Sequence, residues 1–350
     1  MLKKFLGGFS RDMGIDLGTA NTLVYVKDKG IIINEPSIVA VNTRTDQILA
    51  VGEEAKKMLG KTPPHIIAIR PLVDGVISDF EVTEKMLKYF IDRVHKEGIT
   101  LAPRPRVVIG IPLDVTEVER KAVEDAALSA GAREVLLVEE PMAAALGARL
   151  PVRDPSGNLI IDIGGGTTEM AIISLGGVVT SQSLRTAGDE FTESIVQYLR
   201  DHFNLLIGVK TAEDVKIKLG TVVTQAKPIV MAVRGRDLVT GLPREVTVTD
   251  VEVREALIKI VKMILEHMRA TIENTPPELA ADIFERGVVM VGGGSLLKGL
   301  DQLIATQLSI PVQIADDPLT CVVRGTGIIL EDLERMRDLL LPAREAAVIR

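Results

Sequence analysis

The chain has 350 residues, enough for about two domains of ordinary size, and 46% of them are hydrophobic although only 3% are aromatic. A charged fraction of 25% and a net charge of −7 exclude an intrinsically disordered chain and disfavour a nucleic-acid partner. The single cysteine, Cys321, excludes a disulfide framework and suits a reducing cytosol. No run of about 18 apolar residues predicts a membrane-spanning helix, so the aliphatic side chains must be placed elsewhere.

Residues 1–12 predict a separate membrane-binding segment. Apolar residues recur there at the spacing of one helix face, namely Leu2, Phe5, Leu6 and Phe9. Basic residues accompany them, as is typical of a short amphipathic helix that forms at an anionic bilayer surface. The alternative interpretation is a frayed terminus. Leu101, in the apolar segment 99–102, is a second candidate for membrane contact.

A strand–turn–strand pattern follows this segment. The apolar run that ends at Asp16 leads into a turn with Gly18 and Thr19, and residues 23–26 predict a second strand. A glycine turn lets phosphate oxygens approach backbone N–H groups, and a threonine hydroxyl adds another donor. A carboxylate at the strand end can hold hydrated Mg²⁺, which takes few protein carboxylates. Taken alone, such a pattern is more often a plain tight turn.

Helices and buried strands then alternate along the chain. We expect an amphipathic helix over 83–96 and, beyond it, buried strands at 107–111 and 135–138. A capping box at Thr116 predicts a helix between the two strands, and Pro141 favours another helix that it begins. Buried parallel strands that alternate with helices indicate an α/β fold.

Glu140 follows the strand 135–138, at the carboxyl end where α/β folds place their ligands. A carboxylate there can align a water molecule for in-line attack on a γ-phosphate, and its neighbour Glu139 is expected to face away. The alternative is that Glu140 is a glutamate favoured by the dipole of the following helix.

The segment 151–158 is rich in turn formers and predicts a domain boundary, after which the first pattern returns. An apolar strand ends in Asp162, a glycine turn leads to Thr167, and another apolar strand follows. Two such hairpins, a domain length apart, favour two similar domains that clamp the polyphosphate of one nucleotide between them.

A small β-rich insertion is expected over 230–248, with turns at Gly235 and Gly241. A capping box at Thr249 then predicts a long helix that ends near Asn274, before two prolines.

A third glycine run, Gly292–Gly294, joins the apolar strand 288–291 to a helical pattern that starts at Leu296. A strand, a glycine turn and a helix N-terminus together form a cradle for a phosphate or a sugar. The alternative is a plain turn with Ser295 as the helix N-cap. No complete P-loop or dinucleotide motif competes, and four scattered histidines argue against a transition-metal site.

Five motifs together resemble the nucleotide-site and connecting motifs of the ATPase superfamily of actins, sugar kinases and heat-shock chaperones: IDLGTANT, VEEPMAAALG, IDIGGGTTEMA, VGGGSLLKGL and the segment Cys321–Gly327. Within this superfamily the chain is most similar to the MreB family of bacterial actins, over nearly its whole length. The resemblance implies an actin-like (ribonuclease H-like) α/β fold. Two duplicated α/β domains would surround a nucleotide cleft, each with a smaller subdomain.

The resemblance also implies where these parts begin and end. After the segment 1–12, the first large subdomain would comprise residues 13–32, 71–147 and 321–350, with the first small subdomain at 33–70. The second large subdomain would comprise residues 148–180 and 250–320, with the second small subdomain at 181–249.

By the same resemblance, two loops would bind the phosphates, the first with Asp16, Gly18, Thr19, Ala20 and Asn21, and the second with Gly164, Gly165 and Gly166. Asp16 and Asp162 would hold Mg²⁺ through water molecules. The catalytic set would be Glu140, Asp162 and Thr167, with Glu140 and Thr167 positioning the attacking water.

The nucleoside would lie between two further groups. Gly292, Gly293 and Gly294 would border the adenosine, and Glu213 and Lys216 would flank the adenine and ribose. Two stretches differ from the sequence that is usual in the family, namely Val209-Lys210 and the residues 187–190.

The function implied is that of an ATP-dependent, filament-forming cytoskeletal protein with slow ATPase activity, using ATP/ADP and Mg²⁺. It would be cytoplasmic and bound peripherally to the inner face of the cell membrane, where it organises cell-wall synthesis and maintains rod shape. Its partners would be further copies of itself, the membrane, the cell-wall elongation machinery and membrane-anchored shape proteins. The alternatives are a small-molecule (sugar) kinase and a non-hydrolysing ATP-binding membrane adaptor on the same fold.

Overall fold

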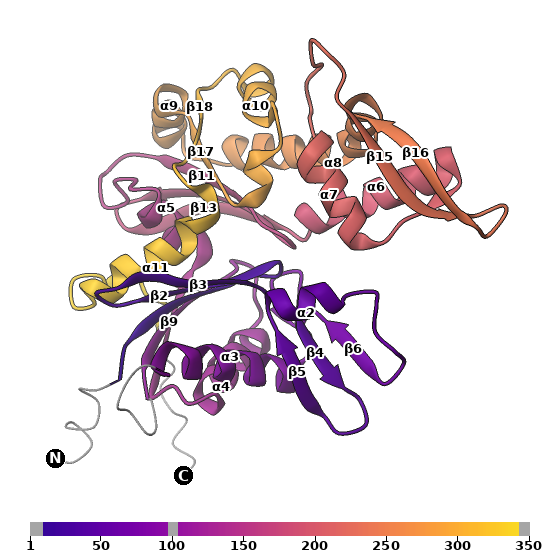
Figure 1. Cartoon of the computed structure of the whole chain (residues 1–350). Helices are drawn as coiled ribbons and strands as arrows, with labels where there is room; N and C mark the ends of the chain where they lie inside the picture. Colours follow the sequence, from indigo (N-terminus) through magenta and orange to yellow (C-terminus); the bar gives the residue numbers. More distant parts are fainter. Residues whose placement is uncertain (1–9, 97–103, 343–350) are drawn as a thin grey trace.

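Two lobes face each other across a pair of helices, α5 (Glu140–Gly147) and α11 (Cys321–Glu331), as Figure 1 shows. The computed structural model describes residues 10–96 and 104–342. Each lobe is built on a five-stranded sheet, and a smaller sheet extends each lobe to one side.

The first sheet has the order β10-β9-β1-β2-β3. Its strands are β1 (Met13–Leu17), β2 (Asn21–Val26), β3 (Gly30–Pro36), β9 (Arg106–Ile111) and β10 (Glu134–Glu139). The strands β1, β2 and β3 form antiparallel hairpins, whereas β9 and β10 run parallel to β1. The expected strand–turn–strand pattern around Gly18 and the parallel strands at 107–111 and 135–138 are therefore confirmed.

The second sheet repeats this arrangement in the order β13-β12-β11-β17-β18. Its strands are β11 (Asn158–Ile163), β12 (Thr168–Ser174), β13 (Gly177–Leu184), β17 (Val288–Val291) and β18 (Val312–Ile314). Again the first three strands are antiparallel and the last two are parallel to the first. The duplication expected from the two aspartate hairpins is thus present in strand order and direction.

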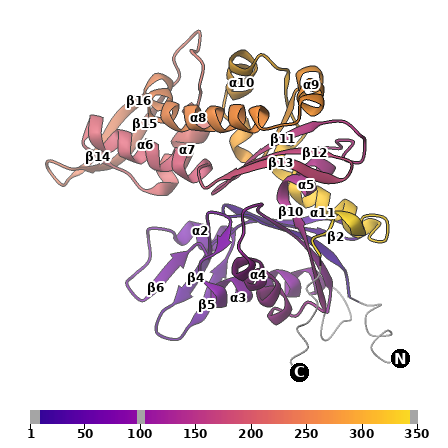
Figure 2. The ribbon, with the colours of Figure 1, turned by 180° about the vertical axis from the view of Figure 1, so that it is seen from behind.

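Helices and sheets stack in alternating layers (Figure 2). Outside the first sheet lie α3 (Phe80–His95) and α4 (Glu117–Ser129), between the sheets lie α5 and α11, and outside the second sheet lie α8 (Asp250–Glu273), α9 (Pro277–Arg286) and α10 (Leu300–Leu308). Consecutive residues of one strand place their side chains in different hydrophobic cores. Ile161 packs into the core beneath α8, and Ile160 packs against α5 and α11. Sheets buried on both faces explain the continuous aliphatic runs of their central strands.

The smaller layers are insertions in the two lobes. In the first lobe they are β4 (Val39–Asn42), β5 (Gln47–Val51), α2 (Glu53–Met58) and β6 (Ile66–Ile69), followed by the hairpin of β7 (Leu72–Val73) and β8 (Val76–Ile77). In the second lobe they are α6 (Gly188–Phe203), β14 (Leu205–Leu206), α7 (Val209–Leu219), β15 (Val230–Asp237) and β16 (Pro243–Thr249). The described residues also form three short 3₁₀ helices, η2 (Gly293–Leu296), η3 (Pro318–Thr320) and η4 (Arg337–Leu339). The residue boundaries expected for the four subdomains stay a prediction.

Both expected capping boxes are present, because Thr116 and Thr249 accept the N–H groups of Glu119 and Glu252, whose side chains reach back to the caps. The helix expected over 83–96 begins earlier, at Phe80, because the Asp79 side chain accepts the N–H of Val82 and caps it there.

Three further expectations need correction. Pro141 is the second residue of α5 and not the first. Gly235 lies inside β15, where a side chain would stand 2.5 Å from the carbonyl oxygen of Leu206, so the glycine permits close strand approach and makes no turn. Gly292–Gly294 leads into only one 3₁₀ turn, and α10 begins at Leu300 with Gly299 as its N-cap.

Candidate functional site

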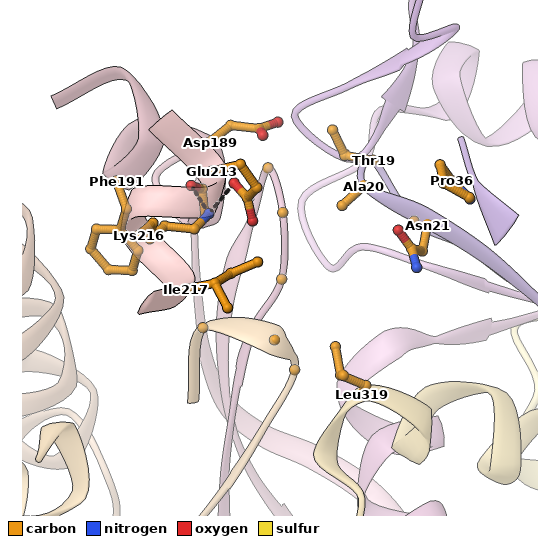
Figure 3. A pocket seen from close by; sticks show the side chains of 18 of the residues that line it. Thr19, Ala20, Asn21, Pro36, Asp189, Phe191, Glu213, Lys216, Ile217 and Leu319 are labelled. Atoms are coloured by element: carbon orange, nitrogen blue, oxygen red, sulfur yellow. Dashed lines mark hydrogen bonds and ion pairs between the residues drawn. The ribbon is translucent and has the colours of Figure 1, made fainter. Parts of the chain in front are cut away.

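A cavity of about 690 Å³ lies between the two lobes. The residues predicted from the sequence for phosphate, metal, nucleoside and catalysis all line it: Asp16, Gly18, Thr19, Ala20, Asn21, Glu140, Asp162, Gly164, Gly165, Gly166, Thr167, Glu213, Lys216, Gly292, Gly293 and Gly294. Figure 3 shows Thr19, Ala20 and Asn21 on one side of this cavity, with Glu213 and Lys216 opposite them. Glu140 lines the cavity and Glu139 does not, in agreement with the expected orientations.

The two glycine loops meet in the cavity. A side chain at Gly165 would stand 2.7 Å from the Ala20 methyl group, and one at Gly166 would stand 2.8 Å from the Thr19 hydroxyl. The Thr19 hydroxyl also accepts the N–H of Gly75 at 3.0 Å. Because only glycine fits these approaches, backbone N–H groups of both lobes remain close to the same small volume, as phosphate binding requires.

Three carboxylates of the cavity lie at strand or helix ends, Asp16 on β1, Asp162 on β11 and Glu140 at the start of α5. Burial, and then the charge of Asp162, raises the pKa of Asp16 to about 8, and burial raises the pKa of Asp162 to about 7. Burial raises the pKa of Glu140 well above 4.5, helped by Glu169, Asp16 and Asp162. Within residues 10–96 and 104–342, no lysine or arginine forms an ion pair with these carboxylates.

Asp16 and Asp162 fit a hydrated Mg²⁺. The repulsion between two buried carboxylates is relieved when a dication binds, and Mg²⁺ usually keeps several waters and takes only one or two carboxylates. Among the described residues no group of three or more His, Cys, Asp or Glu side chains forms a metal cluster. A cation held through water by two aspartates needs no such cluster.

The far end of the cavity is formed by α6, α7 and the third glycine run. Lys216 on α7 pairs with Glu213 at 2.7 Å and donates to the carbonyl of Gly188 at 2.8 Å, as the dashed lines in Figure 3 indicate for the ion pair. Gly292 has a φ of +78°, and a side chain there would overlap the carboxylate of Asp162. The glycine run therefore lies directly against Asp162 while it lines this end of the cavity.

The sequence did not reveal an ion pair that joins the two lobes at the lining of the cavity. Arg70, just beyond β6, places Nη1 2.7 Å from Oδ1 of Asp189 at the start of α6. The backbone N–H of Asp189 donates to the carbonyl of Gly165 at 2.7 Å. Asp189 belongs to the stretch 187–190, which differs from the sequence usual in the family. The sequence around Arg70, however, gives no indication that Asp189 is its partner.

The residues expected to contact the membrane all lie outside the described residues, namely Leu2, Phe5, Leu6, Phe9 and Leu101. In the part of the chain that the structure describes, none of the helices combines the length and apolar character needed to cross a bilayer.

Duplicated sheets of the same strand order, joined by two central helices and enclosing a cavity with two glycine loops, define an actin-like nucleotide-binding protein. The solved structures that are similar to the chain agree. MreB5 of Spiroplasma citri bound to ADP matches with a TM-score of 0.88 and 40% identity, over 94% of this chain and 98% of that one. A MamK double helical filament shares the fold with a TM-score of 0.78 and 24% identity, over 92% and 99% of the two chains.

The chain belongs to the MreB/Mbl family, whose model matches residues 10–338. It is 52% identical to the cell shape-determining protein Mbl of Bacillus subtilis over 328 residues, 94% of this chain and 98% of that protein. It is also 52% identical to the cell shape-determining protein MreB of Escherichia coli over 340 residues, 95% of this chain and 97% of that protein. The family and the actin-like fold expected from the motifs are thus confirmed.

Proposed function

We propose that this chain is an ATP-dependent, filament-forming bacterial actin that binds the inner face of the cell membrane and organises cell-wall synthesis to maintain rod shape. The observation that carries the proposal is the meeting of two glycine loops, one from each lobe, in a cavity that is also lined by Asp16, Glu140 and Asp162. Relatives named cell shape-determining proteins, and MreB5 structures bound to ADP and AMPPNP, support it.

The reaction we propose is slow hydrolysis of ATP. Backbone N–H groups of the loops at Thr19 and Gly164–Gly166 bind the phosphates, and Asp16 and Asp162 hold Mg²⁺ through water. The bound Mg²⁺ supplies positive charge that offsets the charge of the phosphate oxygens. Glu140 orients the attacking water, together with Thr167. Its raised pKa makes the Glu140 carboxylate a stronger acceptor for the proton of that water.

Membrane binding would use one corner of the first lobe. The hydroxyl of Ser10 accepts the N–H of Arg104 at 3.0 Å, and the backbone N–H of Arg11 donates to the His95 ring at 3.0 Å. The described residues that border the segments 1–9 and 97–103 are therefore in contact with one another. Because each segment is short, several copies in a filament would be needed for firm attachment. The proposed partners there are the cell-wall elongation machinery and membrane-anchored shape proteins.

Glu140→Ala tests the catalytic assignment. We expect at least a tenfold loss of phosphate release, because a positioned base contributes about 100-fold or more, with filaments still seen by electron microscopy. Glu139→Ala is the matched control, since it removes a neighbouring carboxylate that does not line the cavity. Equal, slow release by wild type and Glu140→Ala would contradict the assignment.

Sedimentation with anionic liposomes separates the proposed function from its alternatives. A filament-forming membrane protein should pellet with the vesicles in an ATP-dependent way. A soluble monomer that phosphorylates a sugar would instead be a kinase. A protein that binds ATP and membranes but releases no phosphate would be an adaptor.

A further inference from the structure

Glu169 is a buried carboxylate for which the proposed reaction has no role. It lies on β12, just beyond Thr167, and only 1% of its surface is exposed. In the β11–β12 hairpin it is the direct cross-strand partner of Asp162. Side chains of directly opposite residues lie on the same face of a sheet, so Glu169 is on the face of the hairpin from which Asp162 reaches the cavity.

One carboxylate oxygen of Glu169 joins the two lobes. The backbone N–H of Leu113, in the segment that follows β9 of the first lobe, donates to Oε1 at 2.7 Å. Pro112 of the same segment lies beside the second glycine loop. A side chain at Gly75 would stand 2.8 Å from the Pro112 ring and 3.0 Å from the Thr167 methyl group. Glu169 therefore fixes the segment 112–113 next to a predicted catalytic residue.

The other oxygen, Oε2, is buried and makes no well-formed hydrogen bond among the described residues, although the hydroxyl of Ser183, directly opposite on β13, lies close enough to lower the pKa of Glu169. An unpaired buried carboxylate oxygen is costly, so a folded protein that retains one calls for a specific explanation. Gly110, on β9 three residues before Leu113, lies against Glu140, because a side chain there would stand 3.3 Å from Cγ of Glu140. The segment that Glu169 holds thus leads directly from the carboxylate that we assign to water orientation.

A purely structural role would leave no reason for this placement. Asp250 shows what such a role looks like: it is 2% exposed and, at the start of α8, accepts the N–H of Ile229, the residue before β15 in the same lobe, at 2.9 Å. Glu169 makes the same kind of bond, but across the two lobes and beside Glu140 and Thr167.

We propose that Glu169 is a positioning residue for ATP hydrolysis, which holds the segment 112–113 and Glu140 in the relative position that the attacking water requires. This inference rests on the proposed function. Glu169 acts through Leu113 and Glu140, and its second oxygen can accept a hydrogen bond from a water molecule bound between them.

The test compares Glu169→Ala with Glu169→Gln in the full chain. Glu169→Ala should lower kcat for phosphate release about tenfold or more at an unchanged KM for ATP, because only the reacting geometry is lost. Glu169→Gln keeps an acceptor oxygen for the N–H of Leu113 and should retain kcat within about threefold. Hydrogen exchange of the Leu113 amide should be faster in Glu169→Ala and unchanged in Glu169→Gln.

Asp250→Ala is the matched control, because it removes an equally buried carboxylate and its bond to a backbone N–H away from the cavity. It should lower the melting temperature and leave kcat unchanged. Wild-type kcat in Glu169→Ala, or equal losses in the Ala and Gln variants, would overturn the role of Glu169. A wild-type chain that releases no phosphate from ATP would instead overturn the proposed function itself, so the two failures are distinguishable.

Discussion

Asp16 and Asp162 make the stability of the nucleotide-free protein depend on pH. Their pKa values rise from 3.8 in the unfolded chain to about 8 and about 7 in the fold, mainly because both carboxyl groups are buried. Between these values the folded state binds more protons than the unfolded state, so stability falls as the pH rises. The contribution of the two groups is fully present below about pH 4 and is lost as the pH passes through their folded pKa values.

Asp16→Asn should therefore raise the melting temperature of the protein at pH 8 in the absence of nucleotide and metal. Asparagine has no charge to bury, and each ~1 kcal/mol gained shifts the midpoint by about 2–4 °C in domains of this size. The advantage should shrink toward pH 5, where the native carboxyl group is protonated. Thermal unfolding in a chelating buffer measures both effects. Asp201→Asn is the control, because the Asp201 side chain is exposed. A lower melting temperature at pH 8 would contradict the burial argument.

Individual residues differ in how far the sequence reveals them. Asp16, Asp162 and the glycines could be predicted because each belongs to a local pattern that appears twice along the chain. Glu169 stands inside one of these motifs, yet its role depends on Leu113, which belongs to the other lobe. Arg70 and Asp189 are likewise brought together only by the closure of the two lobes. Contacts between distant segments leave no periodic pattern in the sequence.

The helices α5 and α11 cross with their backbones in direct contact. A side chain added to Gly147 would overlap the carbonyl of Cys321, and one added to Gly325 would overlap the carbonyl of Ala143. Each helix thus supplies a glycine where it meets the backbone of the other. Together with the buried alanines of α5, these glycines allow one thin helical layer to separate the two sheets.

Gly325→Ala should destabilise the protein by about 1–3 kcal/mol or more, because overpacking forces the two helices apart. Urea unfolding followed by circular dichroism measures this loss. Gly177→Ala is a suitable control, since its added methyl group would meet only the carbonyl oxygen of Ser174, at 4.0 Å. Equal stability of the two variants would show that α5 and α11 can move apart at their crossing without loss of stability.

Elements with local start and stop residues were predicted best. The helices α4 and α8 begin at capping boxes that involve residues only three positions apart. The apolar repeat alone predicts too late a start for α3, because the capping residue Asp79 precedes that repeat. The helix α10 begins later than the apolar pattern predicts, and Gly294 in the 3₁₀ turn before it lies directly against Ile163, a contact that the local sequence does not reveal.

At the scale of the whole molecule, the alternating layers account for much of the mean hydropathy of +0.25. Two sheets with both faces covered bury nearly every side chain of their central strands, as in β11 and β12. Apolar surface still remains, most notably at the turn between β15 and β16, where Val239 is 79% exposed and Leu242 is 65% exposed. Exposed aliphatic groups of this kind are consistent with the self-association that we propose.

The ion pair between Arg70 and Asp189 connects the two lobes at the lining of the nucleotide cavity, so it should slow the separation of the lobes that releases nucleotide. About a third of each side chain is exposed, 30% and 31%, and such pairs contribute about 0.2–1 kcal/mol. Arg70→Ala should therefore speed dissociation of a fluorescent ADP analogue by about two- to fivefold, measured by displacement with excess unlabelled ATP.

Asp189→Ala should have a similar effect, and the double variant should dissociate no faster than either single variant, because all three lack the same pair. Salt should reduce the difference from wild type, since the pair is partly exposed. Arg234→Ala is the control, because its ion pair with Glu245 lies within the β15–β16 hairpin and spans no cavity. Additive effects of the two single variants would mean that each side chain acts on nucleotide release separately and that the ion pair itself does not slow it.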